Sequence, residues 1–217
     1  MGKKKLTIAE IFSSAVENHQ KNNLKVAEKL YKDVLTKNSN HTNANNNLGI
    51  LFHQLGKLNE SINYFKKAIK TKPSHENAYY NLGKIFNELR DNKNAIYCYE
   101  KAIEINPKDF NAYNNLGVIH QGLAEYKKAI QFYKKAVEIK PNYIDAYNNL
   151  GTLLVECNHL NDAKNIFEKL LNIEPNKKTF EGYGNLLLKL NQHNKALNYI
   201  KKGTGFIRFS QKEVKII

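Results

Sequence analysis

Apolar, small and polar residues alternate along this chain in a pattern that repeats every 34 residues. The stretch ANNNLG begins at Ala44, AYYNLG at Ala78, and AYNNLG at both Ala112 and Ala146. Within each interval, apolar or small residues recur at helical spacing in two groups, which a polar break separates. Such spacing is typical of amphipathic helices. The pattern therefore predicts two antiparallel helices in every interval.

The repeats extend beyond the four matching stretches. If each repeat starts two residues before its opening alanine, five repeats and an irregular sixth follow: 8–41, 42–75, 76–109, 110–143, 144–176 and 177–203. Residues 1–7 remain as a basic N-terminal tail, and residues 204–217 break the period. We expect this C-terminal segment to be extended and to cap the last repeat, or else to begin a following element.

Small residues occur where two helices would have to approach closely. A glycine inside a helix costs up to about 1 kcal/mol, so its recurrence predicts compensating close packing. The eighth position of the repeats holds Ala15, Gly49, Gly83, Gly117, Gly151 and Gly184, and the twentieth holds Ala27, Ser61, Ala95, Ala129, Ala163 and Ala196. Aromatic residues, Tyr31, Phe65, Tyr99, Tyr133 and Phe167, occupy the twenty-fourth position of the first five repeats. Proline, which cannot continue a helix, ends four repeats.

This order of residues resembles the tetratricopeptide repeat. The second repeat carries the motif as Leu48-Gly49, Phe52, Phe65, Ala68 and Pro73, and the fourth as Leu116-Gly117, Ala129, Tyr133, Ala136 and Pro141. The first and sixth repeats are degenerate, as terminal repeats of a solenoid are expected to be. The resemblance implies an all-α fold, a right-handed superhelical solenoid of stacked helix-turn-helix repeats. It also implies that the first helix of each repeat lines an inner groove.

Asparagine dominates the expected groove. The sixth position holds Asn47, Asn81, Asn115 and Asn149. The fifth position adds Asn46, Tyr80, Asn114 and Asn148, and the ninth adds Lys84. A primary amide offers two donors and an acceptor, so it can bind both polar groups of a peptide unit. The pattern is similar to the superhelical repeat domain of O-linked N-acetylglucosamine transferases, in which an asparagine ladder holds peptide. The alternative is that these amides face solvent or cap neighbouring helices.

The resemblance favours a non-catalytic scaffold that binds an extended peptide or partner segment in this groove. One alternative is the substrate-recruiting module of a glycosyltransferase-type enzyme whose catalytic part is absent. Another is RNA binding through a basic outer face. A carboxylate clamp for chaperone C-termini is not favoured, because the second position holds Asn43, Asn77, Asn111 and Asp145. The sequence leaves the partner and the oligomeric state open.

The distribution of charge tempers the nucleic-acid alternative. The net charge is +14, but residues 177–217 hold nine Lys and Arg against two acids, while the first 176 residues hold 25 against 18. Most of the chain thus has a mixed-charge surface with a modest positive bias. The lysines of the second helices would face outward and keep the protein in solution.

No catalytic or metal-binding motif occurs. His120 takes a position that is normally packed, and Cys157 with His159 offers fewer ligands than the three or four that a zinc site needs. We expect no enzymatic activity, no cofactor and no metal. The N-terminus lacks the features of a secretory signal, and no apolar run is long enough to span a membrane. With two widely separated cysteines, the chain fits a cytoplasmic protein.

Overall fold

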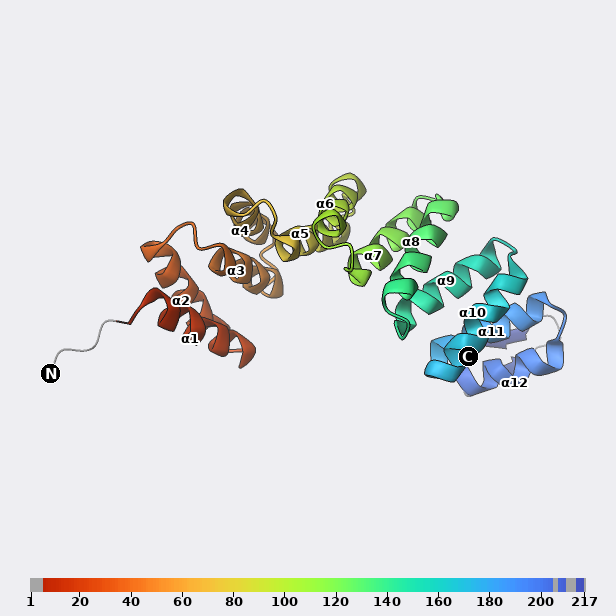
Figure 1. Cartoon of the computed structure of the whole chain (residues 1–217). Helices are drawn as coiled ribbons and strands as arrows, with labels where there is room; N and C mark the ends of the chain where they lie inside the picture. The colour runs from red at the N-terminus through yellow and green to blue at the C-terminus, as the bar shows by residue number, and fades with distance from the viewer. Residues whose placement is uncertain (1–5, 205–206, 210–213, 217) are drawn as a thin grey trace. The chain divides into compact units, whose positions relative to one another are not determined.

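The computed structural model describes residues 6–204, 207–209 and 214–216 (Figure 1). The described residues form twelve helices and two short strands. The helices are α1 (Ile8–Gln20), α2 (Leu24–Lys37), α3 (Thr42–Gln54), α4 (Leu58–Thr71), α5 (Glu76–Glu88), α6 (Asn92–Ile105), α7 (Phe110–Gly122), α8 (Tyr126–Ile139), α9 (Ile144–Glu156), α10 (Leu160–Ile173), α11 (Lys177–Lys189) and α12 (His193–Thr204). Each predicted repeat thus contains one pair of helices, which confirms the all-α solenoid.

The helix pairs belong to two compact units, Met1–Pro107 and Lys108–Ile217. The first compact unit contains α1 to α6, and the second contains α7 to α12. In both units each helix packs chiefly against its partner within the same repeat, and then against the next repeat (Figure 1). This arrangement is the nearest-neighbour packing expected of repeat proteins.

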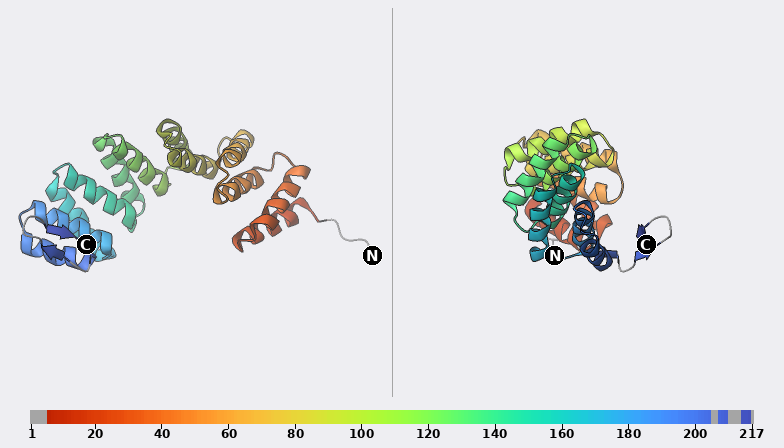
Figure 2. Two further views of the ribbon diagram at one scale, coloured as in Figure 1. Left: turned by 180° about the vertical axis from the view of Figure 1, so that it is seen from behind. Right: turned by 90° about the vertical axis from the view of Figure 1, so that its right-hand side faces the viewer.

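The C-terminal segment contains the two strands. β1 (Ile207–Phe209) pairs antiparallel with β2 (Val214–Ile216), and Ile207 lies opposite Ile216 (Figure 2). The extended backbone predicted for this segment is confirmed at these residues. The prediction that this segment caps the last repeat depends on side chains that lie outside the described residues. Most of the predicted N-terminal tail also lies outside them.

The turn between the two helices of every repeat contains one residue with left-handed backbone. These residues have φ between 57° and 71°. Asn22, Gly56, Arg90, Ala124, Asn158 and Asn191 occupy this place, at the fifteenth position of each repeat. Asparagine and glycine adopt this conformation readily, whereas other residues lose about 1–2 kcal/mol. The tight turn therefore carries some strain at Arg90 and Ala124.

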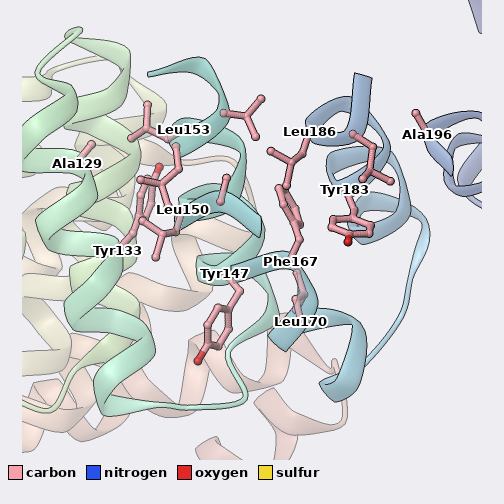
Figure 3. Close-up of a cluster of buried hydrophobic side chains, with 14 residues drawn as sticks. Ala129, Tyr133, Tyr147, Leu150, Leu153, Phe167, Leu170, Tyr183, Leu186 and Ala196 are labelled. Carbon is pink, nitrogen blue, oxygen red and sulfur yellow. The ribbon is translucent and has the colours of Figure 1, made fainter. Parts of the chain in front are cut away.

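The glycines of the eighth position lie directly against the aromatic rings of the second helices. A Cβ atom added at Gly117 would lie 2.5 Å from Tyr133 Cε1, and one added at Gly151 would lie 2.8 Å from Phe167 Cζ. Both rings are fully buried in the cluster of apolar side chains that forms the core of the second compact unit (Figure 3). The predicted compensation by close helix packing is confirmed.

The twentieth position also tolerates little extra volume. Ala129 is fully buried in the same cluster (Figure 3). We expect Ala129→Leu to lower the free energy of unfolding by about 1–3 kcal/mol through overpacking. Urea denaturation followed by circular dichroism measures the change, with Ala9→Leu at an exposed helical position as the matched control. Equal stability of the two variants would show that the helices do not pack as described.

Histidine caps two of the first helices. His75 Nδ1 accepts a hydrogen bond from the Ala78 N–H at 3.2 Å, which requires the neutral ring. Burial, with a smaller contribution from Lys72, lowers the pKa of His75. Because the unfolded chain then binds the proton more readily, stability falls as the pH drops from the unfolded towards the folded pKa.

We therefore expect the first compact unit to lose up to about 1 kcal/mol of stability between pH 7.5 and 5 through this group. The His75→Asn variant keeps a capping side chain that does not titrate. The test is the difference between wild type and His75→Asn in urea midpoints at the two pH values. Parallel behaviour of both proteins would refute the role of this cap.

Candidate functional site

The first helices of the repeats lie side by side within each compact unit. In the first unit these are α1, α3 and α5, and in the second α7, α9 and α11 (Figure 1). We call these surfaces the first-helix faces. Polar side chains join neighbouring first helices near their C-terminal ends. These pairs are His19 Nε2 with Gln54 Oε1 at 2.9 Å, His53 Nε2 with Glu88 Oε2 at 2.8 Å, and Gln121 Nε2 donating to Glu156 Oε2 at 3.4 Å.

One hollow, of about 420 Å³, lies on the first-helix face of the first compact unit. Its lining includes His19, Tyr31, Asn47 and Ile50, and we call it the Asn47 hollow. Asn47 Nδ2 donates to the Tyr31 hydroxyl at 3.4 Å, and that hydroxyl lies 3.3 Å from His19 Nδ1. Burial raises the pKa of the Tyr31 hydroxyl, which accepts the bond from Asn47. Asn47 is thus held by the preceding repeat.

A second hollow, of about 290 Å³, lies on the first-helix face of the second compact unit. We call it the Asn149 hollow. Its lining residues are Gln121, Asn148, Asn149, Thr152, Lys178, Glu181, Gly182 and Asn185. Asn149 Nδ2 donates to Asn114 Oδ1 at 3.1 Å, a bond that joins α9 to α7. Asn148 is only 7% exposed, and its side-chain amide has no hydrogen-bond partner among the described residues.

The predicted site residues fall into two groups. Those of the sixth position, Asn47, Asn81, Asn115 and Asn149, are all partly buried on the first helices. The side chain of Asn81 makes no hydrogen bond within the described part of the chain. Of the fifth position, Asn46, Asn114 and Asn148 are buried, and Asn148 also lines the Asn149 hollow. Asn46 and Asn114 hydrogen-bond to sixth-position amides: Asn46 Nδ2 donates to Asn47 Oδ1 at 3.2 Å, and Asn114 Oδ1 accepts from Asn149 Nδ2.

Tyr80 and Lys84 line neither hollow. Tyr80 is partly buried, with its ring centroid 5.7 Å from that of Tyr99, and Lys84 is exposed on α5. Of the nine predicted residues, Asn47, Asn148 and Asn149 line the two hollows and the other six do not.

Sequence reasoning missed several residues of the hollows. His19, Gln54 and Gln121 belong to the pairs that join first helices, and such partners are 35 residues apart rather than 34. A search for polar pairs at this spacing could have found them. Lys178 was also missed, because it stands at the second position of the sixth repeat, where the second to fifth repeats hold asparagine or aspartate.

The remaining candidate residues have structural roles. His120 is 5% exposed, its Nδ1 lies 2.7 Å from Glu125 Oε2, and its ring stacks on Phe132, which confirms its predicted place in the core. Cys157 and His159 flank the left-handed turn residue Asn158. Within the described part of the chain, no three His, Cys, Asp or Glu side chains are grouped as metal ligands would be. Nor does any described helix have the length and apolarity needed to cross a membrane.

Comparison with known families and structures gives a consistent result. The model described as "TPR repeat" matches residues 51–89 and 83–123, and two models described as "Tetratricopeptide repeat" match residues 110–143 and 132–165. These matches together span just over half of the chain. No curated protein sequence matches the chain.

Similar solved structures cover most of the chain. A MamA protein is 28% identical, with a TM-score of 0.69, and the match covers 77% of this chain and 91% of that one. PilF of Pseudomonas aeruginosa is 14% identical, with a TM-score of 0.78 and 90% of each chain covered. YrrB, described as a TPR protein with an unusual peptide-binding site, is 22% identical, with a TM-score of 0.70 and coverage of 81% and 91%.

Proposed function

Because the chain belongs to the tetratricopeptide repeat family, we propose that its first-helix faces bind an extended segment of a partner protein. The observation that carries this proposal is the recurrence of amide side chains in hollows of both compact units. Asn47 lies in one hollow and Asn149 in the other, each fixed by a hydrogen bond to the preceding repeat. The protein would act as a scaffold with no chemistry of its own.

The chemistry of the hollows suits the backbone of an extended peptide. Such a backbone presents N–H donors and C=O acceptors in alternation, and an amide can pair with both. Ile50 in one hollow and Thr152 in the other provide less polar contacts for ligand side chains. Recognition through backbone groups would tolerate many ligand sequences. Ordering a flexible segment reduces the net affinity, so we expect micromolar rather than nanomolar binding.

Charge at the second hollow would add direction to binding. Lys178 and Glu181 both line the Asn149 hollow, whereas no Lys, Arg, Asp or Glu lines the Asn47 hollow. A ligand with a charged residue at one end would thus prefer one orientation. The described peptide site of YrrB shows that proteins of this fold can bind peptides, and it supports this proposal by analogy.

The RNA-binding alternative receives less support from the surface. Several lysines of the second helices are paired with acids of the same helix, which reduces their attraction for phosphate. These pairs are Lys32 with Glu28, Lys101 with Glu104, Lys135 with Glu138 and Lys164 with Glu168.

The proposal can be tested with peptides selected from a random library on the immobilised full chain. For a selected peptide, N-methylation of successive backbone nitrogens removes donors without altering side chains. We expect N-methylation at several positions to weaken binding by about tenfold each, and alanine replacement of most side chains to matter less. Fluorescence anisotropy measures both series. Insensitivity to N-methylation, or failure to select any peptide, would contradict the proposal.

A further inference from the structure

The second repeat lacks an aromatic ring that the later repeats possess. At the fourth position the third to sixth repeats hold Tyr79, Tyr113, Tyr147 and Phe180, whereas the second repeat holds Asn45. These rings fill the space between the two helices of their repeats. The Tyr113 ring lies 6.4 Å from that of Phe132 on α8, and the Phe180 ring lies 6.2 Å from that of Tyr199 on α12.

A lysine of the second helix covers this ring in two repeats. Lys169 lies 5.2 Å from the centre of the Tyr147 ring, and Lys202 lies 5.9 Å from that of Phe180. The equivalent lysine of the second repeat is Lys67. Asn45 offers no ring, and Lys67 lies 4.8 Å from the centre of the Tyr64 ring on its own helix.

A hollow of about 620 Å³ remains where the first and second repeats meet. We call it the α2–α4 hollow, because Leu35 of α2 and Tyr64, Lys67 and Lys70 of α4 line it together with Asn45. Asn45 is 1% exposed and donates to the Ser39 and His41 carbonyls at 3.0 and 3.3 Å. Its Oδ1 atom has no partner among the described residues, and an unpaired buried acceptor is costly.

The second repeat also lacks an acid that two later repeats possess. In the third repeat Lys101 pairs with Glu104 at 2.6 Å, and in the fourth Lys135 pairs with Glu138 at 2.8 Å. The residue equivalent to these glutamates is Lys70. Within the described residues, neither Lys67 nor Lys70 forms an ion pair, so the α2–α4 hollow carries two uncompensated positive charges.

We propose that the α2–α4 hollow binds a partner peptide in which an aromatic side chain lies next to a carboxylate. The aromatic side chain would fill the space that Tyr113 and Tyr147 fill in their own repeats. The carboxylate would pair with Lys67 and Lys70, as glutamate does at the equivalent place in the third and fourth repeats. The hollow lies between α2 and α4, apart from the Asn47 hollow, so this site is independent of the first-helix faces.

The test uses the full chain and a fluorescein-labelled peptide with Tyr-Glu-Glu flanked by Gly and Ser. We expect saturable binding, detected by fluorescence anisotropy. Peptides with Ala-Glu-Glu or Tyr-Gln-Gln should bind at least about tenfold more weakly, because the first has no aromatic ring and the second has no carboxylate side chain. Two variants restore what the later repeats contain. Asn45→Tyr supplies the ring and Lys70→Glu supplies the acid, and each should reduce binding of the Tyr-Glu-Glu peptide by about tenfold or more.

The use of two variants separates a loss of binding from a loss of folding. Asn45→Tyr removes two hydrogen bonds of a buried amide, whereas Lys70 is exposed and its replacement leaves the core intact. Thermal melts of both variants accompany the titrations. Equal binding of the three peptides, or unchanged binding by Lys70→Glu, would overturn the proposal. Displacement of the labelled peptide by adenosine monophosphate at equal concentration would also overturn it, and would assign the hollow to nucleotides.

Discussion

Replacing Phe167 by alanine is expected to lower the free energy of unfolding of the second compact unit by about 3–5 kcal/mol. The Phe167 ring is fully buried between α9 and α11 (Figure 3). A Cβ atom added at Gly151 would lie 2.8 Å from this ring, and one added at Gly182 would lie 2.5 Å from it. Both of these close contacts come from glycines, so neither position offers a side chain that could move in to fill the cavity. The loss should therefore fall at the upper end of the range for large-to-small substitutions.

Urea denaturation measures the overall loss, and Tyr126→Ala is the matched control. Tyr126 is 45% exposed on α8, so its replacement should change stability by less than about 0.5 kcal/mol. Hydrogen exchange locates the effect, because stability in repeat proteins depends on nearest neighbours. Amides of α9 to α11 should exchange faster in Phe167→Ala, while those of α1 to α4 should not change. A loss below about 1 kcal/mol would contradict the packing described for this ring.

Replacing Asn81, Asn115 and Asn149 together by alanine is expected to weaken binding of a library-selected peptide by at least about tenfold. A hydrogen bond contributes about 0.5–1.5 kcal/mol net, so three lost bonds suffice for this effect. The three side chains are partly buried on first helices. Alanine favours helix formation, so the melting temperature should change little. The bond from Asn149 to Asn114 is lost in the variant, at a small cost in stability.

The matched control replaces three asparagines of the second helices, Asn63, Asn161 and Asn165, which are exposed on α4 and α10. This variant has the same change in composition but keeps the first-helix faces intact. When both variants are titrated with the same labelled peptide, the first-helix variant should bind it more weakly than the control variant does. Equal affinities would show that the asparagines of the sixth position do not contact the ligand.

The features that repeat in the sequence could be predicted because repetition itself is evidence. The helix pairs follow from the apolar spacing, and the contact of Gly117 with Tyr133 follows from small and large residues at fixed positions. His120 was correctly placed in the core for the same reason. In each case many equivalent positions impose one local environment, so a single sequence is sufficient to identify it.

Features that depend on the orientation of single side chains could not be predicted. Asn148 lines the Asn149 hollow, but the sequence could not show that its side chain is only 7% exposed and that its amide has no hydrogen-bond partner among the described residues. Ala124 has left-handed backbone although alanine does not favour it, because the tight turn between two packed helices requires it. The α2–α4 hollow is lined by Asn45, at a position where later repeats hold an aromatic residue. Only the structure shows where those aromatic rings and the equivalent lysines lie in the later repeats.

The most direct test of the central claim is to locate a bound peptide on the chain by photo-crosslinking. Thr152 is exposed and lines the Asn149 hollow on α9, whereas Asn165 is exposed on α10. Each is replaced in turn by benzoylphenylalanine, and the variant is irradiated with the library-selected peptide and examined by mass spectrometry. If an extended segment binds along the first-helix faces, the peptide becomes attached through position 152 and not through position 165. Attachment through position 165 alone would place the ligand on the second helices and contradict the account.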